Sequence, residues 1–518
     1  MQELPNGKRS ASPFTNRVPY APGLTTKRPA TASAAVQLSA TKRISRSEAC
    51  PCGSSMRFRD CCGRIGHGAE ATRVDIAAQH ECLGRIRRAG ELLLRGESRR
   101  AAAALAGLQP GDVTQAAIAL DTADILLECN NTAAALPWAK RAVDLSLGSP
   151  VAVARYDECC ALLKRRETRQ GEARLIGSVL ARINARAGSP RHRLRERKVH
   201  IVGKLDNIGG SERRALNLYR TLSKREVPVT LWSTAAVRPE FAREFPVRGI
   251  SPESTPNGGV LALISTYFDC PWLNSSAFER IVVCHNLADH NRTLLSKLEQ
   301  IESNPAAPLV RLTFPSRMFR RYMDLPGQVQ YSPVDLGHFR RQRPPARRER
   351  LAVGRHARQS VAKFHPNDPA FCRELLRRGY DVKLLGGAAI AEAFTGDANP
   401  LPQLLPVGDV DARTFLEGLD VFVYRKHPHA VETGGTTIME AMAMSLPVIV
   451  FGEDCGIAEL ISDGQNGFLV DTEAQALQVL DSLRTDASLA RRIGSAARET
   501  IERVMQQQSS TLTDFYLD

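Results

Sequence analysis

The sequence lacks long apolar runs. Nowhere do eighteen consecutive apolar residues occur, so no transmembrane helix is expected. The first twenty residues also lack the apolar segment of a secretory signal peptide. Twelve cysteines in a chain without such a signal indicate reduced thiols or metal ligands rather than disulfides. We therefore expect a cytoplasmic protein.

Negative charge is in deficit. The chain has 70 Lys and Arg against 55 Asp and Glu, a net charge of +15. This excess is explained either by an Arg-rich solvated surface or by attraction to phosphate-bearing ligands, acidic partners or anionic lipid. Peripheral contact with the inner face of a membrane is compatible with it. The length of 518 residues, with 43% hydrophobic content, predicts two to four domains.

A cysteine cluster lies near the N-terminus, in the string CPCGSSMRFRDCCG. Cys50, Cys52, Cys61 and Cys62 are four soft ligands that a Pro-Gly turn could gather, and such a set suits tetrahedral zinc. So short a module cannot bury a useful core, so a structural zinc would supply its folding energy. The string resembles the SEC-C zinc motif, known from the tail of the bacterial protein-export motor ATPase. That resemblance implies protein contacts. The alternative is four incidental thiols.

The N-terminal third divides by composition. Residues 1–45 are rich in Ser, Thr, Pro, Arg and Lys without periodicity, which predicts a disordered basic tail before a zinc module at 46–67. Residues 70–190 are mostly helix formers. Three segments, ELLLRGESRRAAAAL, DILLECNNTAAALPWA and ALLKRRETRQGEARL, each read as helix, turn, helix near the spacing of tetratricopeptide repeats. They predict three stacked hairpins that bind a protein partner; the alternative is an ordinary helical bundle.

The most informative stretch is ETGGTTIMEAMAMSLPVIVF. Glu432 and Glu440 are separated by seven residues, with a Gly-Gly turn after the first and a helix carrying the second. The backbone N–H groups of Gly435, Thr436 and Thr437 would lie between the acids, free to bind an anion. Carboxylate, anion site and carboxylate is the layout that a nucleotide-sugar requires.

The same run continues into GIAELI and DGQNGFLVD, and it resembles the C-terminal half of the retaining GT-B glycosyltransferases, the "group 1" family. The match is close over residues 432–471 and looser from about 198 onward. The resemblance implies an α/β fold with two Rossmann-like domains, an acceptor domain at 197–338 and a donor domain at 351–500, followed by a helix at 501–518. One departure is Gly434, which stands where the family usually has an aromatic residue and predicts a looser loop.

Two glycines and a histidine are candidates in the first of these domains. Gly209 and Gly210 form a loop between an apolar strand and a helix, where a ligand can approach the backbone closely. His285 ends the strand RIVVCHN. In the resembled family a histidine at this place lies near the reacting sugar. The alternative is a structural histidine that satisfies loop carbonyls.

The second domain contributes Arg355, Lys363 and Gly408. Arg and Lys suit a diphosphate, and the resembled family binds its donor diphosphate with such a pair, although the spacing here is longer than in many members. Gly408 is expected beside the base. Asp409 and Asp411 mimic a metal-binding Asp-x-Asp motif, but we interpret Asp411 as a helix N-cap.

The resulting hypothesis is a retaining glycosyltransferase that needs no metal at its active site and acts on a glycan, lipid or protein acceptor. The resemblance gives catalytic roles to His285 and Glu432. It gives donor contacts to the remaining candidates, with Glu440 on the ribose. No specific nucleic-acid partner is expected. The competing hypothesis is a non-catalytic adaptor, in which the zinc module and the repeats recruit a protein and the glycosyltransferase-like half is degenerate.

Overall fold

The computed structural model describes Arg57 and residues 76–94, 97–129, 131–187, 194–342, 349–394, 401–428, 430–452 and 455–518. The chain divides into one unit at residues 1–74 and another at 75–518, and the second is described below. The predicted tail and the four cysteines of the zinc module lie outside the described residues.

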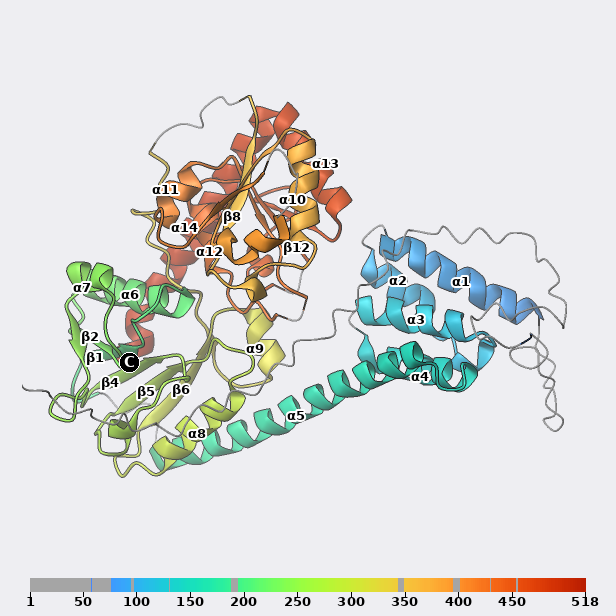
Figure 1. The fold of residues 1–518 in the computed structure, drawn as a ribbon. Helices are drawn as coiled ribbons and strands as arrows, with labels where there is room; N and C mark the ends of the chain where they lie inside the picture. The colour runs from blue at the N-terminus through green and yellow to red at the C-terminus, as the bar shows by residue number, and fades with distance from the viewer. Residues whose placement is uncertain are drawn as a thin grey trace, which may run out of the picture. The chain divides into compact units, whose positions relative to one another are not determined.

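Two helical hairpins open the described unit (Figure 1). They comprise α1 (Ile76–Leu94) with α2 (Ser98–Leu105), then, after the turn η2 (Pro110–Asp112), α3 (Ala116–Glu128) with α4 (Thr132–Leu145). Their shared core is rich in buried alanine around Trp138. Small side chains let the helices approach closely. These hairpins are the first two of the three predicted.

The prediction of a third hairpin is wrong. The helix α5 (Pro150–Ala187) runs unbroken for 38 residues through the segment expected to turn. That segment is polar, but its Arg, Glu and Gln residues are good helix formers, and it contains no proline. Gly171 alone costs about 1 kcal/mol, too little to end a helix anchored at both sides. The tetratricopeptide pattern is therefore not seen.

The second half of α5 belongs to the next domain. Ile176, Val179 and Ile183 are buried in the same cluster as residues of β6 (Leu309–Phe314) and α8 (Asn291–Glu302). The amide of Asn184 pairs with the backbone of Val310, donating to its carbonyl at 3.0 Å and accepting from its N–H at 2.8 Å. The predicted boundary near residue 190 therefore falls after a helix that both parts share.

The first sheet is parallel throughout. Its strand order is β3-β2-β1-β4-β5-β6-β7. Three central strands are buried at every residue, as expected for a parallel sheet covered on both faces. The elements not yet bounded are β1 (Val199–Gly203), α6 (Gly210–Ser223), β2 (Val229–Ser233), α7 (Pro239–Glu244), β3 (Val247–Gly249), β4 (Val260–Ile264), η3 (Pro271–Asn274), β5 (Arg280–Cys284), α9 (Arg317–Met323) and β7 (Gln328–Val329).

The second sheet has six parallel strands in the order β10-β9-β8-β11-β12-β13. Together the two sheets are the pair of Rossmann-like domains predicted from the sequence. The elements of this second domain are β8 (Ala352–His356), η4 (Val361–Lys363), α10 (Asp368–Arg377), β9 (Asp381–Leu385), η5 (Gly387–Phe394), β10 (Gln403–Leu405), α11 (Ala412–Glu417), β11 (Val421–Tyr424), α12 (Thr436–Ala443), β12 (Val448–Phe451), η6 (Ala458–Leu460), β13 (Phe468–Val470), α13 (Glu473–Thr485) and α14 (Ala487–Leu517).

The last helix, α14, ties the two Rossmann-like domains together. Its middle, at Ile501, lies in the core of the second domain, and its end, at Tyr516, lies in the core of the first. The buried guanidinium of Arg280 donates to the carbonyl of Tyr516 at 2.9 Å, and Arg311 donates to that of Phe515 at 2.8 Å. The segment 501–518 is therefore the second half of α14 rather than a separate helix.

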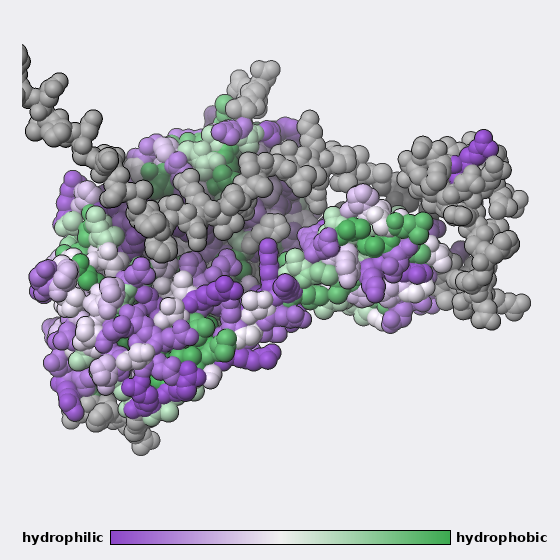
Figure 2. Space-filling view, turned by 60° about the horizontal axis from the view of Figure 1, so that its bottom comes forward, coloured by the Kyte–Doolittle hydropathy of each residue, from purple (hydrophilic) through white to green (hydrophobic). Residues whose placement is uncertain are grey.

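Hydrophilic side chains cover most of the described surface in Figure 2, and the hydrophobic patches between them are small. Leu147 and Val151, beside the start of α5, are the most exposed large hydrophobic residues of the described chain. Among the described residues, no helix combines the length and the apolar character that crossing a membrane requires.

Candidate functional site

Each sheet changes its winding direction at one point. In the second domain the chain passes from β8 outward to β10 and then returns to the other side of β8 with β11. Ligands of such sheets bind beyond the carboxyl ends of the strands that flank this point. The loops that follow β8 and β11 carry Lys363 and Glu432. The first domain has the same arrangement at β1 and β4, and the loop after β1 carries Gly209 and Gly210.

Glu432 is held by three groups at the end of the β11 loop. Its carboxylate accepts a bond from the ammonium of Lys363 at 3.2 Å, a short bond from the hydroxyl of Tyr424, and one from the backbone N–H of Gly435 at 3.2 Å. Burial raises the pKa of Glu432, but the charge of Lys363 and these hydrogen bonds outweigh it and hold the pKa below its ordinary value. Glu432 is thus an anion paired with a cation.

The start of α12 differs in one detail from the prediction. The N–H of Gly435 is not free, because it donates to Glu432. The first hydrogen bond of the helix comes from Ile438, which donates to the carbonyl of Gly435 at 3.0 Å, so the N–H groups of Thr436 and Thr437 lie ahead of it. Gly435 has a positive φ of 61°, and a Cβ on it would lie 2.7 Å from Ile457. Only glycine fits this turn.

Glu440 lies on α12, after Glu432 in the chain, and is 2% exposed. Its Oε2 lies 2.7 Å from Nε2 of His356, and its Oε1 lies 3.9 Å from Nε of Arg213, on α6 of the first domain. Burial raises the pKa of Glu440, but the charge of Arg213 and the bond to His356 more than offset this, and the pKa is lowered. The two acids therefore lie as the sequence predicted, on either side of a helix start.

Arg355 is deeper than the prediction implied. It is 4% exposed and donates to the carbonyls of Arg425 and of Lys363, the latter at 3.0 Å. Its guanidinium also lies over the ring of Tyr424, 4.4 Å from the ring centre. In this arrangement Arg355 ties the β8 and β11 loops together. Its contact with a donor diphosphate stays a prediction.

The Gly-Gly loop of the first domain faces the second domain. A Cβ on Gly210 would lie 3.9 Å from the hydroxyl of Thr436, and one on Gly209 would meet both Glu212 and Arg358. Burial raises the pKa of Glu212, and the positive charge of Arg358 opposes that rise. The glycines thus line the junction between the domains, beside the start of α12.

The loop after Glu432 is well held, contrary to the looseness expected from Gly434. The hydroxyl of Thr433 donates to the carbonyl of Asn286 at 2.9 Å, and the hydroxyl of Ser316 donates to the carbonyl of Thr433 at 2.6 Å. Gly434 is buried, and a Cβ there would lie only 3.0 Å from Pro315. A larger residue at this position would require Pro315, from the first Rossmann-like domain, to give way slightly.

His285 is almost fully buried. It is 1% exposed, and its ring packs against Phe314 and Phe319. Burial lowers the pKa of His285 to about 4, although the side chain of Asn291 favours the charged form. Neither ring nitrogen has a hydrogen-bond partner of good geometry among the described residues. The ring is neutral and adjoins the loop that Thr433 contacts; its catalytic role stays a prediction.

The remaining candidates lie near α11. Asp411 caps this helix, since its carboxylate accepts from the N–H of Thr414 at 3.0 Å, which confirms the N-cap interpretation. Gly408 has a φ of 104°, and the space where its Cβ would stand is open. The preceding Val407 donates its N–H to Gln359 of the β8 loop at 3.1 Å. Gly408 therefore borders open space near that loop, and its contact with a base stays a prediction.

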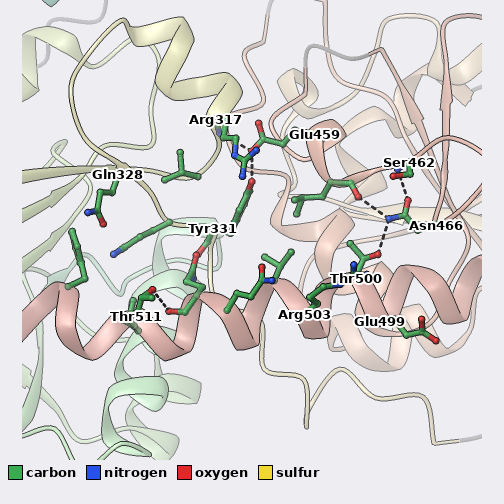
Figure 3. A pocket seen from close by; sticks show the side chains of 18 of the residues that line it. Arg317, Gln328, Tyr331, Glu459, Ser462, Asn466, Glu499, Thr500, Arg503 and Thr511 are labelled. Carbon is green, nitrogen blue, oxygen red and sulfur yellow. Dashed lines mark hydrogen bonds between the residues drawn. The ribbon is translucent and has the colours of Figure 1, made fainter.

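A separate groove of about 1050 Å³ runs along α14. Figure 3 shows Arg317, Tyr331 and Glu459 converging in one part of it, and Ser462, Asn466 and Thr500 linked in another. Of the described residues predicted to form the site, none lines this groove. Neither Glu432 nor Glu440 is among its lining residues.

Four residues of the site were missed from the sequence. His356 and Arg358 follow Arg355 directly in GRHAR, and Glu212 and Arg213 follow the Gly-Gly loop in GGSERR. Their signal was their position beyond a strand end, next to residues already chosen. The approach of Arg213 to Glu440 and of Arg358 to Glu212 crosses the two domains, so it could not be read from either string alone.

The fold and this geometry define the chain as a GT-B protein: two parallel Rossmann-like sheets with paired acids at the switch point of the second. Residues 404–500 match the family model described as "Glycosyl transferases group 1", and residues 46–64 match the SEC-C motif. The first of these matches covers the C-terminal part of the second Rossmann-like domain. SEC-C motifs commonly bind metal.

Solved structures with a related fold include a glycosyltransferase from Rickettsia africae, at 14% identity and a TM-score of 0.45, covering 62% of this chain and 98% of that one. Another is Anabaena HepE in complex with UDP-glucose, at 15% identity and a TM-score of 0.46, covering 61% and 99%. A third is WaaG, a glycosyltransferase involved in lipopolysaccharide biosynthesis, at 13% identity and a TM-score of 0.40, covering 62% and 99%. Similarities of this size say nothing about donor or acceptor. No curated protein matches the chain in sequence.

Proposed function

We propose that the protein transfers a sugar, with retention, from a nucleoside-diphosphate sugar to a glycan, lipid or protein acceptor. One observation carries the proposal: Glu432 and Glu440 bracket the start of α12 at the switch point of the second sheet, and Lys363 pairs with the first of them at 3.2 Å. Two carboxylates and a cation therefore surround the helix N–H groups. A diphosphate flanked by two polyhydroxyl groups matches that set.

In this proposal the leaving diphosphate lies at the N–H groups of Thr436 and Thr437, next to Lys363. Both the helix terminus and the ammonium would stabilise the charge that develops on it. Glu432 would hold sugar hydroxyls, Glu440 the ribose, and Gly209 and Gly210 would let the first domain close on the phosphates. Arg358, exposed on the β8 loop, is a further cation within reach of that junction. No side chain is assigned as a covalent nucleophile, which suits a front-face displacement.

Titration calorimetry of the full chain with UDP-, GDP- and ADP-sugars tests the proposal. We expect one base to bind and its sugar to be hydrolysed slowly when no acceptor is present. Lys363→Ala should weaken that binding, while Lys383→Ala, at a partly exposed ion pair with Asp381 of the same sheet, serves as the matched control. A folded protein that binds none of the three would favour the adaptor hypothesis instead.

A further inference from the structure

The buried acid on α12 has an unusual partner. A carboxylate that is 2% exposed must be hydrogen-bonded or neutralised, because an unpaired buried charge is very costly. Glu440 meets this need through His356, whose Nε2 lies 2.7 Å from Oε2. His356 is the last residue of β8, and β8 is central in its sheet. The central strand therefore holds the imidazole of His356 firmly beside Glu440.

The imidazole has little freedom. Its ring packs edge-on against Phe415 and Phe422, with ring centres 6.3 and 5.7 Å away. Its other nitrogen, Nδ1, has no hydrogen-bond partner among the described residues. The bond to Glu440 is thus the polar contact that orients the ring, and the rings of Phe415 and Phe422 limit its rotation.

The other oxygen of Glu440 is unsatisfied. Oε1 is buried and makes no hydrogen bond among the described residues, and Arg213 approaches it only to 3.9 Å, as an ion pair across the domain junction. His356 therefore fixes Oε2, whereas Oε1 faces Arg213 of the first domain. Oε1 thus has a charged neighbour but no hydrogen-bond donor among the described residues.

Building on the function proposed above, we propose that His356 is a positioning residue for the donor ribose. Its Nε2–H fixes Oε2 of Glu440, so that Oε1 faces the vicinal hydroxyls of the sugar attached to the base. Without this anchor the carboxylate could rotate away or pick up a proton, and it would then accept the ribose hydroxyls poorly. The consequence is selectivity: the site distinguishes a ribonucleotide from a 2′-deoxyribonucleotide, and His356 maintains that distinction.

The test compares UDP, GDP and ADP with their 2′-deoxy counterparts by titration calorimetry on the full chain. We expect wild type to bind the ribose form of one base roughly tenfold more tightly than the deoxy form, as one lost hydrogen bond to a charged group implies. His356→Phe, which fills the same aromatic site without a donor, should lose this preference and bind the deoxy form as wild type does. His356→Gln, whose amide reaches the position of Nε2, should keep the preference.

Two further variants keep the test decisive. Phe415→Leu loosens the same packing without touching the Glu440 bond, so it should retain the ribose preference. His356→Asn stays polar but is too short to reach Glu440, so it should lose the preference even if His356→Phe does not fold. Equal weakening of ribose and deoxy forms in the His356 variants, or a preference that survives in His356→Phe or His356→Asn, would overturn the inference. Wild type that binds no nucleotide at all would instead remove the proposed function itself.

Discussion

The hydroxyl of Tyr331, from the first Rossmann-like domain, donates to the carboxylate of Glu459, from the second, at 2.6 Å. The same carboxylate accepts the N–H groups of Arg317 and Met318, at 2.8 and 2.9 Å, at the start of α9. One side chain thus satisfies three donors of the other domain. Two of these donors are N–H groups at the start of α9 that would otherwise lack partners, so Glu459 links the two domains.

Replacing Glu459 by Gln should weaken this link. The variant keeps one acceptor oxygen but loses the charge that the helix start favours, so we expect about 1–2 kcal/mol less stability. Urea unfolding monitored by tryptophan fluorescence measures the loss. Tyr331→Phe, which removes only one of the three donors, should cost less than Glu459→Gln. Equal stability of wild type and Glu459→Gln would contradict the link.

Lys363→Ala should reduce sugar transfer by at least roughly tenfold, about 1.4 kcal/mol of transition-state stabilisation. The cause is the loss of the cation beside Glu432 and the expected diphosphate. Because Lys363 holds the pKa of Glu432 below its ordinary value, the pair stabilises the fold above that value and loses its effect as pH falls through the lowered pKa. The stability gap between wild type and Lys363→Ala should therefore narrow on acidification. If the stability difference between wild type and Lys363→Ala widened on acidification, the Lys363–Glu432 pair would not be its cause.

His285→Phe separates two roles of that histidine. The pKa of His285 is lowered to about 4, so between pH of about 6.5 and 4 the unfolded chain binds a proton that the folded chain does not. The free energy of unfolding should decrease as the pH is lowered across that window, by up to about 1.4 kcal/mol per pH unit. This decrease should be less steep in His285→Phe. The predicted sugar contact further implies at least a roughly tenfold loss of transfer. A folded variant with full activity would make His285 a core residue alone.

The purified protein should contain about one zinc per chain, held by Cys50, Cys52, Cys61 and Cys62. Elemental analysis of the full chain checks this, with Cys61→Ser and Cys62→Ser as variants that should lose the metal. Cys372→Ser, at a buried thiol in the second domain, should not. Because no metal is assigned to the transfer site, chelation should leave nucleotide-sugar binding intact. Loss of that binding on chelation would contradict the assignment.

A fragment that begins at residue 197 should be unstable. It lacks Ile176, Val179 and Ile183, which are 0–5% exposed in the core of the first Rossmann-like domain. Removing three such side chains exposes the faces of α8 and β6 that they cover, at about 1.5–3 kcal/mol each. A fragment that begins at residue 150, and so retains α5, should remain folded and bind donor. Thermal unfolding of the two fragments tests this prediction. Equal stability would contradict the conclusion that α5 is part of the core of the first Rossmann-like domain.

Local patterns were enough to predict much of the architecture. The resemblance carried by the stretch from Glu432 to Asp471 implied two Rossmann-like domains, and the structure has two parallel sheets. The spacing of Glu432 and Glu440 placed both acids at one helix start, since that depends only on helical rise and on the turn at Gly435. Asp411 was identified as an N-cap for the same local reason.

The rest was decided by contacts between segments far apart in the sequence. The stretch inside α5 is polar enough to suggest a turn, yet it stays helical because its residues are good helix formers and its flanks pack. The space beside Gly434 is limited by Pro315, which lies more than a hundred residues earlier in the chain. Arg355 is committed to two backbone carbonyls, and Glu440 is held by His356, because β8, β11 and α12 meet there. Sequence by itself named the site's acids; the tertiary structure chose their partners, because a buried charge is satisfied by whichever groups the fold brings within hydrogen-bond reach.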